Sequence, residues 1–275
     1  MSTWHRVSFG KFDAVDSVID SLGIRYRKIP EPHGYYLITF AIEESDPRWP
    51  LVAELIREKN TLDLFNTIFS NEEICQAEWV RLIPRFEQGY PQPKVGMMWR
   101  DIAYENACRH CGAGYRQIRP LRLLREPQLG KYDLMSLFWT YSLFCTPRVT
   151  EVLRTHEIRG YEVWEALLHR SNEPSQTVAQ LVFPYVSKGG LARQDRLHPR
   201  TCPECGITTY APHLRGRMRY QRKALHAGLD IQLSEEWFGN GGRSPYREIL
   251  ISNRLARLII EEGWRGAALK PVDLV

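Results

Sequence analysis

Two short stretches decide how this 275-residue chain is put together. The first is ACRHCGAGYRQIRP, residues 107–120, and the second is TCPECGITTYAPHLRGR, residues 201–217. Each contains a Cys-x-x-Cys-Gly motif, and each leads directly into arginine-rich sequence. Ninety residues separate Cys111 from Cys202. The first question is therefore whether the two motifs form one site or two.

Both motifs are typical of a zinc knuckle, in which one tight turn supplies two thiolates. Zinc favours four such ligands in a tetrahedron, and four thiolates leave no open position for catalysis. The glycine after each pair, Gly112 or Gly206, permits a turn with positive φ that directs backbone N–H groups at sulfur. We therefore predict one structural Zn²⁺ ion. Its ligands are Cys108, Cys111, Cys202 and Cys205.

Other interpretations of the cysteines have less support. A redox Cys-x-x-Cys would require a thioredoxin-like βαβ context, which the sequence lacks. His110 could replace a thiolate, but its position between two cysteines predicts that it points outward. Cys75 and Cys145 lie in apolar sequence and are expected to be buried, inert thiols.

An internal repeat would explain the wide spacing of the two motifs. TPRVTEVLRTHEIRGYEVW, from Thr146, aligns with SNRLARLIIEEGWRGAALK, from Ser252, at a constant offset of 106 residues. Both copies predict a hydroxyl N-cap, a short helix, an Arg-Gly turn and a strand. Upstream of each come an apolar strand, an Asp/Trp segment and a Cys-x-x-Cys-Gly motif. The paired Asp/Trp residues are Asp133 with Trp139, and Asp230 with Trp237.

This shared order predicts a degenerate duplication whose two copies are joined by the metal ion. The cysteine motifs are offset by 94 residues, not 106, so the second copy carries an insertion. We place it in the glycine-rich loop at residues 239–245.

The chain as a whole is predicted to have an α+β fold. A small N-terminal α/β unit is followed by two degenerate mixed strand/helix repeats joined by the four-cysteine zinc site. A Pro- and Gly-rich stretch at residues 87–96 suggests a boundary. The predicted domains are thus 1–95 and 96–275, with repeats at about 102–168 and 196–275.

Local signals add detail in the N-terminal part. Residues 34–42 are β-rich, and Asp46 is placed to cap a helix with Pro47 in its first turn. Ser70 and Glu73 have capping-box spacing. They predict a second helix whose inward residues are Ile74, Ala77 and either Trp79 or Val80.

Composition narrows the class of protein. The formal charge is +5 and the apolar fraction is 43%, which is ordinary for a globular chain. The N-terminus has no secretory pattern, and the most apolar stretch, residues 134–145, is too short to span a bilayer. We expect a soluble cytosolic protein with no membrane partner.

The arginines after the second knuckle alternate with apolar residues, which predicts a strand with one cationic face. That face could bind phosphates or an acidic protein patch, or its arginines could simply pair with nearby carboxylates. No RNP-like or helix-turn-helix pattern is present, so nucleic-acid binding is compatible with the sequence but not indicated. The candidate partner-binding residues are Arg215, Arg217, Arg219 and Arg222.

No catalytic motif is found: neither G-x-S-x-G, nor a phosphate-binding loop, nor H-E-x-x-H. We therefore expect a binding protein and not an enzyme. An unrecognised active site around the Asp/Trp segments is a third alternative. There, however, capping aspartates and core tryptophans are the simpler interpretation.

From about residue 102 to residue 275 the chain resembles the bacterial double-CXXCG-motif proteins, which are related to the immunity proteins of polymorphic-toxin systems. The resemblance is carried by the two cysteine pairs, by the TPRVTEVL and SNRLARLI helices and by the WRGAALKPV strand. It implies a non-enzymatic cytosolic protein that neutralises a cognate toxin by binding it, with the four cysteines as metal ligands. It identifies no toxin-contacting residues.

The net charge bears on the partner that this resemblance implies. Inhibitors of cationic nucleases usually present acidic faces, so a basic chain favours an acidic or mixed toxin surface. The alternative is a zinc-ribbon-like, nucleic-acid-binding accessory protein, for example in phage defence, that uses the four arginines named above.

Overall fold

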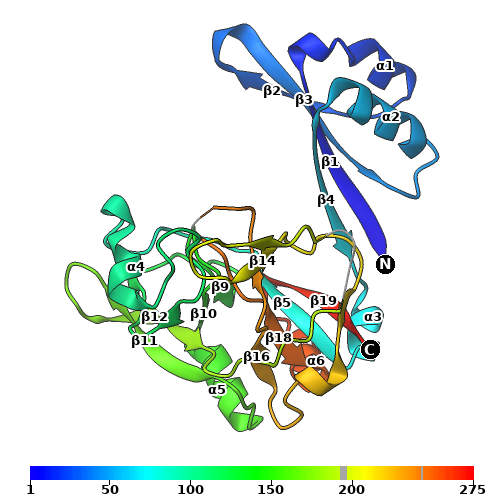
Figure 1. Cartoon of the computed structure of the whole chain (residues 1–275). Helices are drawn as coiled ribbons and strands as arrows, with labels where there is room; N and C mark the ends of the chain where they lie inside the picture. The colour runs from blue at the N-terminus through cyan, green and yellow to red at the C-terminus, as the bar shows by residue number, and fades with distance from the viewer. Residues whose placement is uncertain (193–196, 243) are drawn as a thin grey trace. The chain divides into compact units, whose positions relative to one another are not determined.

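The computed structural model describes residues 1–192, 197–242 and 244–275 and contains both helices and strands (Figure 1). The predicted α+β class is confirmed. The chain divides into two compact units, one formed by residues 1–70 with Leu214–Gly216 and the other by residues 71–213 and 217–275. The predicted start of the second repeat, Arg196, and Arg243 of the predicted insertion loop lie outside the described residues. None of the described helices is long and apolar enough to cross a membrane.

The first unit is an antiparallel sheet with the strand order β2-β3-β1-β4, packed against two helices. Apolar side chains alternate along β1 and β3, so one face of the sheet forms the core with Val52 and Leu55 of α2. The helix α2 begins at Trp49, and Asp46 binds the N–H of Arg48 (2.9 Å) just before it. The elements are β1 Ser2–Gly10, α1 Asp16–Ser21, β2 Arg27–Glu31, β3 Tyr35–Glu43, α2 Trp49–Lys59 and β4 Leu62–Ile68.

The second unit begins earlier than the sequence predicts. The helix α3 ends at Gln76, and Trp79 and Val80 lie on the strand β5 and not on that helix. Because β5 pairs with two C-terminal strands, the boundary between the units falls after Ser70. The predicted boundary at residues 87–96 lies inside the second unit, where the Pro- and Gly-rich sequence forms a connection within one body.

The second unit contains two five-stranded sheets, with the orders β9-β10-β12-β11-β8 and β16-β18-β5-β19-β15, and two smaller sheets, β13-β14-β17 and β6-β7. The strands of the first sheet are β8 Arg122–Leu123, β9 Leu134–Met135, β10 Leu143–Cys145, β11 Glu162–Leu168 and β12 Pro174–Val182, and the helix α5 Pro147–Thr155 connects β10 to β11. The second sheet and its helices comprise α3 Asn71–Gln76, β5 Trp79–Pro84, β15 Met218–Tyr220, β16 Ile231–Leu233, β18 Ile249–Ser252, α6 Asn253–Glu261 and β19 Ala267–Leu274. The remaining elements are α4 Met98–Ala103, β6 Tyr104–Glu105, β7 Arg116–Gln117, β13 Arg200–Thr201, β14 Thr208–Tyr210 and β17 Trp237–Phe238.

The two sheets have the same register. Ile249 of β18 and Leu269 of β19 both pair with Leu82 of β5. The residues 106 positions earlier, on β10 and β11, both pair with Leu181 of β12. This is the offset at which the two sequence copies align, so equivalent residues occupy equivalent places. The duplication that would explain this match stays a prediction.

Each five-stranded sheet takes its central strand from the part of the chain that precedes the other copy's cysteine motif. β5 precedes the first Cys-x-x-Cys-Gly motif but completes the sheet that contains the C-terminal copy, where Figure 1 shows it, in cyan, between the orange and red strands β18 and β19. β12 precedes the second motif but lies between β10 and β11 of the first copy. Each copy therefore depends on a strand from the segment before the other copy's knuckle.

Each Arg-Gly turn is bound by the aspartate of the other copy. The Asp230 carboxylate accepts a hydrogen bond from the N–H of Arg159 (3.0 Å). Asp133 does the same for Arg265 (3.1 Å). These contacts match the capping role that the sequence suggests for the two aspartates.

The glycines of these turns are tightly enclosed. Gly160 has a φ of +105° and Gly266 a φ of +110°, a region that favours glycine. A Cβ atom on Gly160 would overlap the carbonyl oxygen of Ile231, and one on Gly266 would overlap that of Leu134. The close approach of these backbones therefore requires glycine at both positions.

The second sheet buries a charged pair where the first has a neutral residue. Arg81 on β5 and Glu248 are 2% and 0% exposed and form an ion pair. Arg81 also donates to the carbonyl of His213 (3.1 Å), and the Tyr141 hydroxyl donates to Glu248 (3.1 Å). Burial beside this guanidinium lowers the pKa of His213 to about 4. The position equivalent to Arg81 in the first sheet is held by Gln180.

Candidate metal centre

The first knuckle is held by backbone hydrogen bonds between its two arms. The strands β6 and β7 flank it as an antiparallel hairpin. The N–H of Cys108 donates to the carbonyl of Ala113 (2.8 Å), and the N–H of Gly112 donates back to the carbonyl of Cys108 (2.8 Å). Gly112 has a φ of +78°, as the predicted turn requires.

The second knuckle repeats this geometry 94 residues later, between β13 and β14. The N–H of Cys202 donates to Ile207 (2.9 Å), and the N–H of Gly206 donates to Cys202 (2.9 Å). Gly206 has a φ of +71°. Two separate stretches of sequence thus fold into matching turns.

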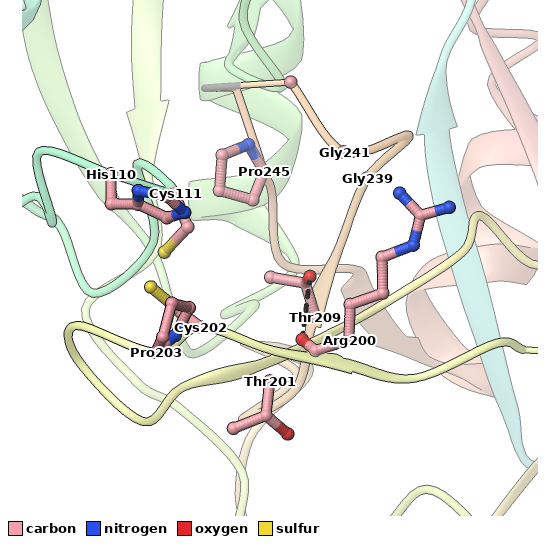
Figure 2. Close-up of a pocket in the computed structure, with 11 residues that line it drawn as sticks. His110, Cys111, Arg200, Thr201, Cys202, Pro203, Thr209, Gly239, Gly241 and Pro245 are labelled. Atoms are coloured by element: carbon pink, nitrogen blue, oxygen red, sulfur yellow. Dashed lines mark hydrogen bonds between the residues drawn. The ribbon is translucent and has the colours of Figure 1, made fainter.

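The two knuckles bring their four sulfur atoms together. The Sγ atoms of Cys108 and Cys202 lie 3.9 Å apart, and those of Cys111 and Cys205 lie 3.6 Å apart. All four lie within 4.8 Å of one another, which is close enough to hold a metal ion. Figure 2 shows the sulfurs of Cys111 and Cys202 pointing toward each other. The predicted ligands therefore form one cluster and not two.

Without a bound cation, ionisation of all four thiols in this cluster is energetically unfavourable. Backbone N–H groups of Cys111 and His110 lower the pKa of Cys108 to about 6. Burial raises the pKa of Cys111 to about 12, and the neighbouring sulfurs add to that rise. A bound divalent ion would remove this conflict, because it stabilises every thiolate that contacts it.

A shallow hollow of about 160 Å³ lies beside the cluster and is lined by Cys111, Cys202 and Arg200 among others (Figure 2). His110 also lines it and is 54% exposed, with its Nδ1 3.4 Å from Glu204 of the opposite knuckle. The histidine is therefore not one of the four clustered ligands. Four thiolates make a closed coordination sphere, which suits a structural ion and not a catalytic one.

Two of the predicted partner-binding arginines are engaged in bidentate ion pairs. Arg215 belongs to the first unit and binds both carboxylate oxygens of Glu44, one of them at 2.9 Å. Arg222 binds both oxygens of Glu78, one of them at 2.7 Å. Both guanidiniums are thus paired with carboxylates of the same chain.

The other two arginines lie on or beside the short strand β15. Arg217 contacts Asp273 (3.5 Å), and Arg219 is exposed between two buried residues. The predicted alternation does not extend back to His213, which is buried. The prediction of a long cationic strand face is therefore wrong, because the strand is only Met218–Tyr220 and ion pairs hold Arg215 and Arg222 outside it.

The Asp/Trp segments do not form one site either. Asp133 and Asp230 each bind a different Arg-Gly turn, as described above. Trp237 is buried, as a core tryptophan should be, whereas Trp139 is 47% exposed.

Sequence patterns missed a second hollow in the second unit, which is rich in aromatic side chains. Its residues come from five separated segments that share no motif. The one sequence hint is the tryptophan of the first Asp/Trp segment, Trp139, which lines it.

No protein-family model matches the chain, and no curated protein matches it either.

Proposed function

We propose that the chain is a non-enzymatic, zinc-stabilised binding protein of the immunity type, which neutralises a cognate bacterial toxin in the cytoplasm by binding it. The observation that carries this proposal is the meeting of two matching Cys-x-x-Cys-Gly knuckles in one four-sulfur cluster. These cysteines are also the residues on which the resemblance to double-CXXCG-motif proteins is based.

Zinc is the ion that suits this ligand set best. Four thiolates in a cytosolic chain favour Zn²⁺ over hard cations such as Mg²⁺ or Ca²⁺, which prefer oxygen ligands. The ion would join two hairpins that belong to the two copies. Its role is then architectural: it fixes the two sheets of the second unit in register and leaves the toxin to be recognised by other surfaces.

The metal proposal gives a direct prediction. Purified protein should contain about one zinc ion per chain, and Cys108→Ser or Cys202→Ser should lose the ion and lower the unfolding temperature together. Cys75→Ser is the matched control, because Cys75 is not in the cluster. The measurements are elemental analysis and thermal unfolding. A wild-type chain that is folded and free of metal would contradict the proposal.

The immunity proposal is tested by co-expression with the product of the adjacent gene. We expect that product to arrest growth when expressed alone, and this chain to restore growth and to co-purify with it. The Cys108→Ser variant should fail to protect, whereas Cys75→Ser should protect like the wild type. A harmless neighbour, or a toxic one that this chain neither binds nor blocks, would count decisively against the immunity role.

A further inference from the structure

A pocket of about 240 Å³ lies in the second unit, and of the described residues it shares only Pro245 with the hollow beside the cysteines. Aromatic rings form most of its wall, and a carboxylate and a guanidinium stand among them. The aromatic residues that line it are Trp99, Tyr104, Tyr115, Trp139, Tyr141 and Tyr246. Such a concentration of rings around a few polar groups is typical of a ligand site.

The wall of this pocket is preorganised by contacts within the protein. The Tyr115 hydroxyl donates to the carbonyl of Pro245 (3.1 Å). Tyr141 and Tyr246 stack with their ring centroids 4.1 Å apart and an angle of 15° between the planes. The hydroxyl of Tyr141 is fixed in turn by Glu248, the buried carboxylate described above. The charged pair that the first sheet lacks therefore positions a pocket wall in the second.

One wall residue is both strained and exposed. Trp139 has a φ of +68°, although bulky residues rarely adopt the left-handed region. The residue is 47% exposed, and its ring packs against Tyr90, with 4.4 Å between the centroids. Strain of this kind is concentrated at functional sites such as ligand clamps. The backbone thus holds a partly exposed indole in the lining of the pocket.

Two polar groups in the pocket lack a partner. Glu87 is an exposed residue at the pocket, and no described residue donates to its carboxylate. Partial desolvation raises the pKa of this carboxyl group. The Tyr104 hydroxyl likewise makes no hydrogen bond within the described residues, and burial raises its pKa. A ligand that carried N–H donors would satisfy both groups.

Two positively charged side chains, Arg100 and Lys94, lie in or near the pocket. Arg100 lines the pocket and donates to the carbonyl of Gly112 (3.2 Å), which orients its guanidinium. The ammonium of Lys94 lies 5.5 Å from the centroid of the Trp139 ring. These cations suit a ligand that joins a planar ring to an anionic group.

We propose that this pocket binds a guanine nucleotide, with the base stacked on Trp139 and its N1–H and N2–H groups donating to Glu87. Unpaired bases are recognised by stacking on aromatic side chains and by hydrogen bonds along their Watson–Crick edge. Guanine presents two adjacent donors on that edge, which match one carboxylate, whereas adenine presents one donor and one acceptor. The phosphate would lie toward Arg100 and Lys94. A partner's aromatic side chain would use the rings but leave the carboxylate and the cations unmatched.

The test is titration of the full-length, metal-loaded protein with GMP, followed by calorimetry and by the indole N–H resonances in NMR spectra. We expect GMP to bind about tenfold or more tightly than AMP. Trp139→Asn should weaken GMP binding by about tenfold or more, since stacking is lost. Asparagine tolerates the left-handed backbone, so this variant should keep its fold. Glu87→Gln should weaken GMP binding and remove the preference over AMP.

Matched controls are Tyr185→Ala, an exposed aromatic outside the pocket, and Glu173→Gln, a carboxylate outside it. Both should bind GMP like the wild type. The proposal fails if GMP does not bind, if it binds no better than AMP, if the two pocket variants bind like the controls, or if N-acetyltryptophanamide binds as well as GMP. None of these outcomes bears on the immunity proposal, whose readout is toxin neutralisation.

Discussion

Gly266→Ala should lower the chain's free energy of unfolding by about 4 kcal/mol or more, one of the largest effects expected of a single methyl group. The added Cβ would overlap the carbonyl oxygen of Leu134, a backbone atom that cannot rotate away. The turn would have to move from Asp133, which binds its backbone N–H. Gly160→Ala should have a similar effect, because Gly160 occupies the equivalent turn.

Gly263→Ala separates the clash from the backbone conformation. Gly263 also has a positive φ, +66°, but an added Cβ would meet nothing within 4 Å. This variant should lose only the left-handed penalty of roughly 1–2 kcal/mol. Denaturant unfolding of the three variants beside the wild type measures both effects. Equal losses at Gly263 and Gly266 would show that the close approach of the two backbones is not what requires glycine.

Glu248→Ala should cost about 3–5 kcal/mol, because it leaves the Arg81 guanidinium buried without its counter-charge. It also removes the acceptor of the Tyr141 hydroxyl. Since Tyr141 and Tyr246 form one wall of the aromatic pocket, the loss of stability should be accompanied by a local change there. Chemical denaturation measures the former, and the near-ultraviolet circular dichroism of the tyrosines reports the latter.

Two comparisons test the cause of this loss. Glu78→Ala removes the carboxylate from the bidentate ion pair with Arg222, but there both partners are well exposed, so its effect should be far smaller. The double variant Arg81→Met, Glu248→Leu should recover much of the lost stability, because neither member of the pair is left buried without the other. A double variant no more stable than Glu248→Ala would contradict the interpretation.

The cysteine cluster could be predicted from sequence because its determinants are local. Each Cys-x-x-Cys-Gly specifies its own turn, and Gly112 and Gly206 adopt the positive φ that this turn requires. Only the meeting of the two turns depends on residues far apart in the sequence. That meeting could be predicted as well, because one tetrahedral zinc ion binds four thiolates and each turn supplies two.

Strand partners could not be predicted in the same way. Alternation shows which face of a strand is buried, but it does not show which strand lies beside it. A helix that extends to Trp79 or Val80 is therefore wrong, because α3 ends at Gln76 and both residues lie on β5. The second unit begins at Asn71, before the predicted boundary. The proline- and glycine-rich sequence at 87–96 marks an irregular connection, and composition cannot distinguish such a connection from a linker between domains.

The arginines and the aromatic pocket show the same limit. Arg215 is separated from Glu44, and Arg222 from Glu78, by well over a hundred residues. The arginines that follow the second knuckle in the sequence therefore do not form a continuous cationic surface, because distant carboxylates pair with two of them. The pocket is equally non-local, since Trp139 joins rings from three other segments.

The exchange of β5 and β12 has a consequence for the order in which the nascent protein matures on the ribosome. β5 leaves the exit tunnel early, but its partners β18 and β19 are among the last strands to be translated. Until they arrive, β5 has unsatisfied backbone groups on both edges, and its apolar side chains are open to chaperones and proteases. The second unit should therefore acquire protease resistance only when translation of β19 is complete, although the sheet around β12 can form well before then.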